Sequence, residues 1–231
     1  MHPHRRAQSS HEKHAHVDED DVVHHDLPVW VAFHEAGHAA SAALLGVPFA
    51  YATLAVLDDE DRDVDAPNVW QPSGAWKTWM HGGARRDRET RLTNVFKCIV
   101  SMLCGPVVES ECRGLPLAEV LAESGQLDRE HATMIAEKIA GASRKNRVLT
   151  AALSQARRLL CSEQGRRAVL RVGVALHERG RLEHGDVLRL MQEPPPGDDV
   201  DAISDSEDVV VLFRFGDGAK PREQLRRVLS G

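Results

Sequence analysis

The sequence feature that most constrains this chain is the segment from Val31 to Ala40, which reads VAFHEAGHAA. Two histidines four residues apart on a helix lie on one face, with Cβ atoms about 5–6 Å apart. His34 and His38 can therefore reach the same zinc ion at bond lengths of about 2.0–2.1 Å. Glu35 would project beside the metal, where it can take a proton from a metal-bound water. The segment predicts two zinc ligands and a general base on one helix.

The residues around this motif argue against a chance match. With 13 histidines in 231 residues, a pattern with only three fixed positions can arise at random. The flanking residues, however, predict a nearly all-apolar helix that ends at Gly46. Burying two histidines and a glutamate in such a helix is costly unless they are paired or bound to a metal. A metal site is therefore the interpretation that we favour.

Composition and charge limit the classes of function. The net charge of -6 gives no electrostatic reason to expect nucleic acid or an anionic membrane as a partner. The sequence contains no run of 18 apolar residues, so it predicts no transmembrane helix. Its polar N-terminus is unlike a signal peptide. The four cysteines form no C-x-x-C pair and are expected to be reduced thiols. We therefore expect a soluble, cytoplasmic protein with no membrane segment and no nucleic-acid partner.

The chain divides into three parts by composition. Residues 1–26 form a polar leader with seven of the histidines, which we expect to be disordered. Residues 27–192 are predicted to form one folded domain, and residues 193–231 an acidic linker with a C-terminal strand at 208–215. Because the leader could hold metal ions loosely, a metal-buffering protein is one alternative function.

Hydrophobic periodicity predicts a mainly helical domain. After the metal helix, residues 51–57 favour a strand. Apolar residues at helical spacing predict helices at residues 88–113, 128–143, 149–162 and 165–179, and a last short helix ending near residue 192. Gly105-Pro106 lies inside the first of these, so a kink is expected there. Trp70, Trp76 and Trp79 could line a binding groove or, as we slightly favour, pin a long loop.

A catalytic zinc site needs a third protein ligand, which leaves one position for water. The downstream candidates are Glu109, Glu111, Asp128 and His131. Asp128 begins a predicted helix, where aspartate is a preferred N-cap. Extrapolating that helix, however, places Asp128 on the same side as Ala132, Ile135 and Ile139. A carboxylate directed at the core requires a partner, so the sequence leaves both roles open.

Several segments together resemble the FtsH-type zinc metallopeptidases. The stretch HEAGHA from His34 is similar to the zinc motif of that family. The stretch CGPVVE from Cys104, followed by Gly114, resembles the family's Ala-Gly-Arg-x-Ala-Glu-Glu helix. Asp128, followed by Ala132-Thr133 and Ile135-Ala136, matches the segment in which the family's third zinc ligand leads into a helix. Residues 153–191 resemble the family's C-terminal helices, so that the likeness covers about residues 28–192.

The resemblance implies a fold and a ligand set. The fold would be mainly α (α+β), a helical zincin-like peptidase domain with a small β-sheet next to the metal helix. His34, His38 and Asp128 would bind zinc, Glu35 would be the catalytic base, and Glu109 would orient a ligand or support the metal helix. The chain departs from the family pattern at three positions. Pro106 stands where the family has arginine, Ser110 where it usually has a second glutamate, and Glu137 where arginine is common.

The function expected from these features is that of a zinc-dependent metalloendopeptidase. Its substrates would be unfolded or flexible polypeptides, cleaved without ATP, because the sequence contains no G-x-x-x-x-G-K-[ST] nucleotide-binding loop. A separate unfoldase or a homo-oligomer is a further partner to consider. If the strand at residues 51–57 is an edge near the metal, it could hold a peptide by strand addition. The alternative is a non-catalytic zinc-binding adaptor or interaction protein that keeps the peptidase fold.

Overall fold

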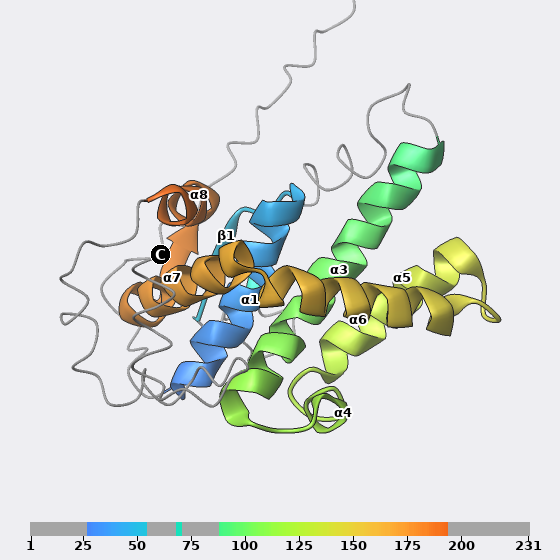
Figure 1. Ribbon diagram of the computed structural model, residues 1–231, viewed down its shortest axis with the longest axis horizontal. Helices are drawn as coiled ribbons and strands as arrows, with labels where there is room; N and C mark the ends of the chain where they lie inside the picture. The colour runs from blue at the N-terminus through green and yellow to red at the C-terminus, as the bar shows by residue number, and fades with distance from the viewer. Residues whose placement is uncertain (1–26, 55–67, 71–87, 194–231) are drawn as a thin grey trace, which may run out of the picture.

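The computed structural model describes residues 27–54 and 88–193, and the backbone of residues 68–70 (Figure 1). It confirms the mainly helical (α+β) fold class. The helices are α1 (Val29–Leu45), α3 (Arg88–Arg113), α4 (Leu117–Val120), α5 (Gln126–Ala140), α6 (Lys145–Cys161), α7 (Glu163–Arg179) and α8 (His184–Gln192). The strands are β1 (Tyr51–Thr53), β2 (Asn68–Trp70) and β3 (Arg181–Glu183).

Helix α1 forms the centre of the core. Residues 32–42 are all buried, because α3 and α7 both pack against this helix, and α7 crosses it in Figure 1. The small side chains of α1 let α3 approach closely: a Cβ atom on Gly37 would lie 2.9 Å from the carbonyl oxygen of Cys104. The helix ends at Gly46 with a φ of 68°, as predicted, since glycine tolerates this left-handed conformation.

The three short strands form one antiparallel sheet in the order β2-β1-β3. Tyr51 pairs with Trp70 on one side and with Glu183 on the other. Strand β1 is therefore central over Tyr51–Thr53, and the edge required for adding a peptide strand there is not free. The backbone N–H of Leu54 donates to the carbonyl of Gly180 at 2.7 Å, which ties the end of β1 to the end of α7.

The predicted helices are present with shifted boundaries. Helix α3 has the predicted bounds and includes Pro106. Helix α5 begins at Gln126, before the predicted start at Asp128, and α6 begins at Lys145. Helix α4 lies in a stretch for which we expected only a connection, and β3 replaces an expected turn. Strand β3 was missed because three residues give too little alternation to detect, and its pairing with β1 comes from a distant segment.

Some predictions fall on residues outside the described ranges. These are the disordered leader at 1–26, the linker and strand in 194–231, residues 55–57 of the first strand, and the side chains of the three loop tryptophans. Helix α3 is long and apolar enough to pass for a membrane span, but 72% of its most apolar window is buried inside the protein. The same burial is found in core helices of soluble proteins, so the cytoplasmic location stays a prediction.

Candidate metal centre

Helices α1 and α5 bring three potential ligands together, and these are the three that we predicted. The Nε2 atoms of His34 and His38 lie 3.1 Å apart. Asp128 places Oδ2 3.2 Å from Nε2 of His34 and Oδ1 3.4 Å from Nε2 of His38. Both imidazoles are buried and the aspartate is partly buried. This His-His-Asp group could hold a metal ion.

The separations of these atoms suit a tetrahedral metal. Ligand atoms bonded at about 2.0–2.1 Å in a tetrahedron lie about 3.3 Å from one another. The three measured separations, 3.1, 3.2 and 3.4 Å, fall on either side of that length. The donor set of two imidazole nitrogens and a carboxylate oxygen leaves a fourth tetrahedral position open for water or substrate.

The hydrogen bond at Nδ1 of each imidazole determines which ring nitrogen is left to bind a metal. Nδ1 of His38 lies 2.9 Å from the carbonyl oxygen of Ser101, which only accepts hydrogen bonds, so Nδ1 carries the hydrogen. Nδ1 of His34 donates in the same way to the carboxylate of Glu109 at 2.7 Å. In neutral rings both Nε2 lone pairs therefore face each other and the carboxylate of Asp128. Three lone pairs at this distance repel unless a cation, either a proton or a metal, lies among them.

The pKa values reflect this demand for positive charge. Burial alone would lower the pKa of His34, but the hydrogen bonds with Asp128 and Glu109 and the charges of Glu35 and Asp128 together raise it to about 10. Burial would likewise lower the pKa of His38, but the charge and hydrogen bond of Asp128, together with the charge of Glu35, raise it. Burial opposes ionisation of Asp128 as well, yet the two histidines hold the pKa of its carboxyl well below the usual range.

Glu35 follows His34 on α1 and lies outside the ligand group, so that its role as a base stays a prediction. Its side chain is buried, and within the described part of the chain its Oε2 atom has no hydrogen-bond partner. Burial raises the pKa of the carboxyl, and the charges of His38 and His34 partly oppose this rise. A carboxylate oxygen that is desolvated and unpaired is free to accept a proton.

Glu109 is the centre of a hydrogen-bond network behind His34. Its side chain is fully buried, and Oε1 accepts from a guanidinium nitrogen of Arg113 and from Oγ of Ser124, each at 2.5 Å. Burial opposes ionisation, but the bonds to His34, Ser124 and Arg113 lower the pKa of Glu109, so the carboxylate is charged. Arg113 also stacks on Trp30, 4.7 Å from the ring centroid. Glu109 thus contacts the ring of His34 on the side away from Asp128, and its role in orienting a metal ligand stays a prediction.

The structure also separates the four candidates for the third ligand. Glu111 and His131 are exposed and do not belong to the ligand group. Residue 111 lies about 200° around α3 from residue 109, so that the two side chains point to opposite sides. Asp128 is not an N-cap, because Gly125 occupies that position and Asp128 lies in the first turn of α5.

The contact between α1 and α3 follows a regular spacing that we did not predict. The α1 residues Trp30, His34 and His38 are four apart and face Arg113, Glu109 and Gly105 of α3, which are also four apart. Rows of residues spaced by four form the ridges through which helices pack. The supporting residues that we missed are Ser101, Gly105, Arg113 and Ser124. For the first three, spacing by four from Glu109 along α3 was the available signal.

No protein-family model matches the chain, and no curated protein matches its sequence. The likeness to FtsH-type peptidases therefore rests on the quoted sequence motifs alone.

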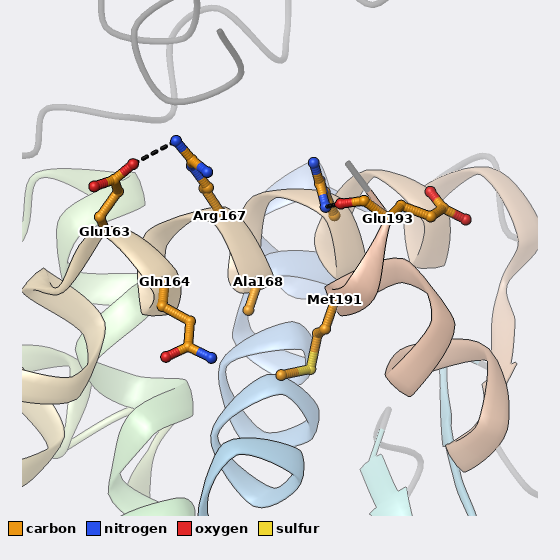
Figure 2. Close-up of a pocket in the computed structure, with 7 residues that line it drawn as sticks. Glu163, Gln164, Arg167, Ala168, Met191 and Glu193 are labelled. Carbon is orange, nitrogen blue, oxygen red and sulfur yellow. Dashed lines mark hydrogen bonds and ion pairs between the residues drawn. The ribbon is translucent and has the colours of Figure 1, made fainter. Parts of the chain in front are cut away.

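A pocket of about 420 Å³ lies away from the metal centre, between α7 and α8 (Figure 2). It is lined by Glu163, Gln164, Arg167, Ala168, Arg171, Met191 and Glu193. Glu163 and Arg167 form an ion pair across one turn of α7. The pocket contains neither a metal ligand nor Glu35, and its acidic and basic side chains favour no single class of ligand.

Proposed function

We propose that this protein is a zinc-dependent metalloendopeptidase that cleaves unfolded or flexible polypeptides without ATP. The observation that carries the proposal is the joint arrangement of the ligand group and Glu35. The ligand atoms of His34, His38 and Asp128 lie 3.1–3.4 Å from one another. Beside them, Glu35 has a buried carboxylate oxygen with no hydrogen-bond partner among the described residues. The resemblance of the quoted motifs to FtsH-type peptidases supports the same reading.

The donor set favours zinc over other common metals. Two imidazoles and one carboxylate, with a fourth position left open, form the ligand pattern of catalytic zinc sites. Magnesium and calcium prefer oxygen ligands, so two imidazoles count against them. When bound, zinc would polarise a carbonyl oxygen and lower the pKa of a coordinated water to about 7.

The residues of the chain would then divide the work of hydrolysis. Glu35 accepts the proton of the attacking water on Oε2 and passes it to the departing amide nitrogen. Its raised pKa suits this exchange, because a general base works best when its pKa is near the working pH. Ser101 and Glu109 hold the two imidazoles through Nδ1, so that both Nε2 atoms face the open site.

The substrate class follows from what such a site can reach. Cleavage requires an extended segment next to the ligands, and a folded protein offers one only when it opens locally. We therefore expect rapid cleavage of unstructured chains and resistance of stably folded domains.

The decisive experiment compares fluorescently labelled casein with a stable folded domain as substrates. Zinc-loaded wild type should cleave casein without ATP, leave the folded domain intact, and lose activity in a chelator. Glu35→Gln should retain its zinc and lose about 10²–10⁴-fold in rate, because the base is removed and the ligands remain. Glu111→Gln, a matched change at an exposed carboxylate, should behave as wild type.

Two results would contradict the proposal. Zinc-loaded wild type that cleaves neither substrate would favour a non-catalytic zinc-binding adaptor with the same fold. Glu35→Gln that cleaves as fast as wild type would remove Glu35 from its proposed role.

A further inference from the structure

Gly105 of α3 lies directly against the imidazole of His38. A Cβ atom at this position would lie 2.3 Å from Nε2, 2.5 Å from Cε1 and 2.8 Å from Cδ2 of that ring. Glycine in the interior of a helix costs about 1 kcal/mol relative to alanine. The ring of His38 explains why the smaller residue is needed here, since any side chain would occupy its space.

Pro106, the next residue, contacts the start of α5. A Cβ atom on Gly125 would lie 2.8 Å from Cγ and 3.0 Å from Cβ of the Pro106 ring, so the two residues are in close contact. Gly125 is the N-cap position of α5, three residues before Asp128. A proline in a helix interior costs about 3 kcal/mol, because it removes one backbone hydrogen bond and clashes with the preceding turn. Its position against α5 gives this costly residue a structural use.

We propose that Gly105-Pro106 is the positioning element of the metal site. Gly105 holds the ring of His38 against α3, where Nδ1 reaches the carbonyl of Ser101 and Nε2 faces the other ligands. Pro106 holds the start of α5 and thereby the distance from Asp128 to both histidines. Neither residue belongs to the ligand group, and both would act through a ligand. The inference rests on the proposed function only in requiring that the His-His-Asp group binds a metal.

The first test is Gly105→Ala. A methyl group 2.3 Å from Nε2 is far inside normal contact, so the ring of His38 must rotate away and lose its bond to Ser101. We expect zinc affinity to fall at least 100-fold, the upper end of what changes around a metal ligand usually cost. Competition with a chromophoric chelator measures the affinity. The visible spectrum of the Co²⁺-substituted protein should change with it, because one ligand has moved.

Gly173→Ala is the matched control. Gly173 lies on α7, and its added Cβ would come within 2.6 Å of the Phe33 ring, on another face of α1. Both variants therefore insert one methyl group between α1 and a neighbouring helix. Gly173→Ala should lower the melting temperature and leave the Co²⁺ spectrum and the zinc affinity of the folded protein unchanged.

Pro106→Ala provides a second test that creates no clash. Removing the ring restores a backbone donor to α3 and takes away the contact with Gly125. The protein should fold, and zinc affinity should fall about 10-fold as Asp128 loses its fixed position. If Gly105→Ala does not fold, this variant decides the question.

The outcomes separate the inference from the proposed function. Wild-type affinity and an unchanged Co²⁺ spectrum in the folded Gly105→Ala and Pro106→Ala variants would overturn the inference, while wild type still binds zinc and cleaves casein. A wild-type protein with no tight zinc site would overturn the proposed function and the inference together. Reduced affinity in both variants, with the Gly173→Ala control unaffected, would support the positioning role.

Discussion

Replacing Glu109 by glutamine should weaken both the fold and the metal site. The buried carboxylate accepts three hydrogen bonds, one on Oε2 from His34 and two on Oε1 from Arg113 and Ser124. A glutamine has only one acceptor oxygen, and its amide nitrogen donates. Whichever way the amide turns, its NH₂ group faces a donor and at least one of these bonds is lost.

The size of the effect follows from the kind of bond that is lost. Hydrogen bonds to charged groups contribute about 1.5–3 kcal/mol each, and the buried ion pair with Arg113 also loses its negative partner. We expect the free energy of unfolding of the metal-free protein to fall by about 2–3 kcal/mol. Zinc affinity should fall about 10–100-fold, because His34 loses the carboxylate that orients it. At about 1.4 kcal/mol for each factor of ten, this is about 1.4–2.8 kcal/mol of binding free energy.

Two measurements on the same variant test this prediction. Urea unfolding of the metal-free protein gives the stability, and competition with a chromophoric chelator gives the zinc affinity. Glu111→Gln is the control, since it makes the same change on the same helix at an exposed side chain. If Glu109→Gln matched this control in both measurements, the hydrogen bonds of Glu109 would have no bearing on the site, and the reasoning from its burial would be refuted.

Three further predictions concern the ligands and the thiols. Asp128→Ala should lose tight zinc binding with its helical circular dichroism intact, whereas Glu111→Ala and His131→Ala should keep the metal. Metal analysis of the purified variants tests this: zinc retained by Asp128→Ala, or lost from one of the other two, would indicate a different third ligand. Zinc binding at pH 7 should release at least one proton and strengthen as pH rises, because the raised pKa of His34, about 10, means that the metal displaces a bound proton. Calorimetry in buffers of different ionisation enthalpy measures this release, and finding none would contradict the prediction. In the native protein Cys161 should react first with a thiol reagent, since it is exposed and the other three cysteines are buried with raised pKa values. Rapid labelling of more than one thiol per chain would contradict the burial of those three.

The sequence was informative where one helix carries its own signal. His34 and His38 share a face through spacing alone, and Gly46 ends the helix through its own backbone freedom. The bounds of α3 were also correct, because 26 residues give the apolar period several repeats. Short elements such as β3 and α4 lack such repeats and were missed.

Residue patterns alone left the third ligand open, and only the resemblance to FtsH-type peptidases pointed to Asp128, because the position of this residue depends on packing. Asp128 is separated from His34 by 94 residues, and its role depends on where α5 begins relative to α1. The N-cap reading of Asp128 assumed a helix start at that residue, whereas the actual start places Gly125 at the cap. Choosing between Glu109 and Glu111 likewise required the face that α3 turns toward α1. The local sequence does not specify how α3 is rotated about its axis toward α1, although the four-residue spacing from Gly105 to Glu109 is consistent with the face that it presents.

Two of the helices that pack against α1 contact different parts of it. Helix α3 contacts the rings of His34 and His38, whereas α7 contacts the apolar face that includes Phe33. Phe33 belongs to a continuous core of buried apolar residues. We therefore expect the fold to form without the metal, unlike that of a structural zinc module. Zinc would then stabilise the protein only by binding to its folded state, by about 4 kcal/mol when its free concentration is 1,000 times Kd. In that case the ligands would be held in position before the metal arrives, which suits the open catalytic site that we propose.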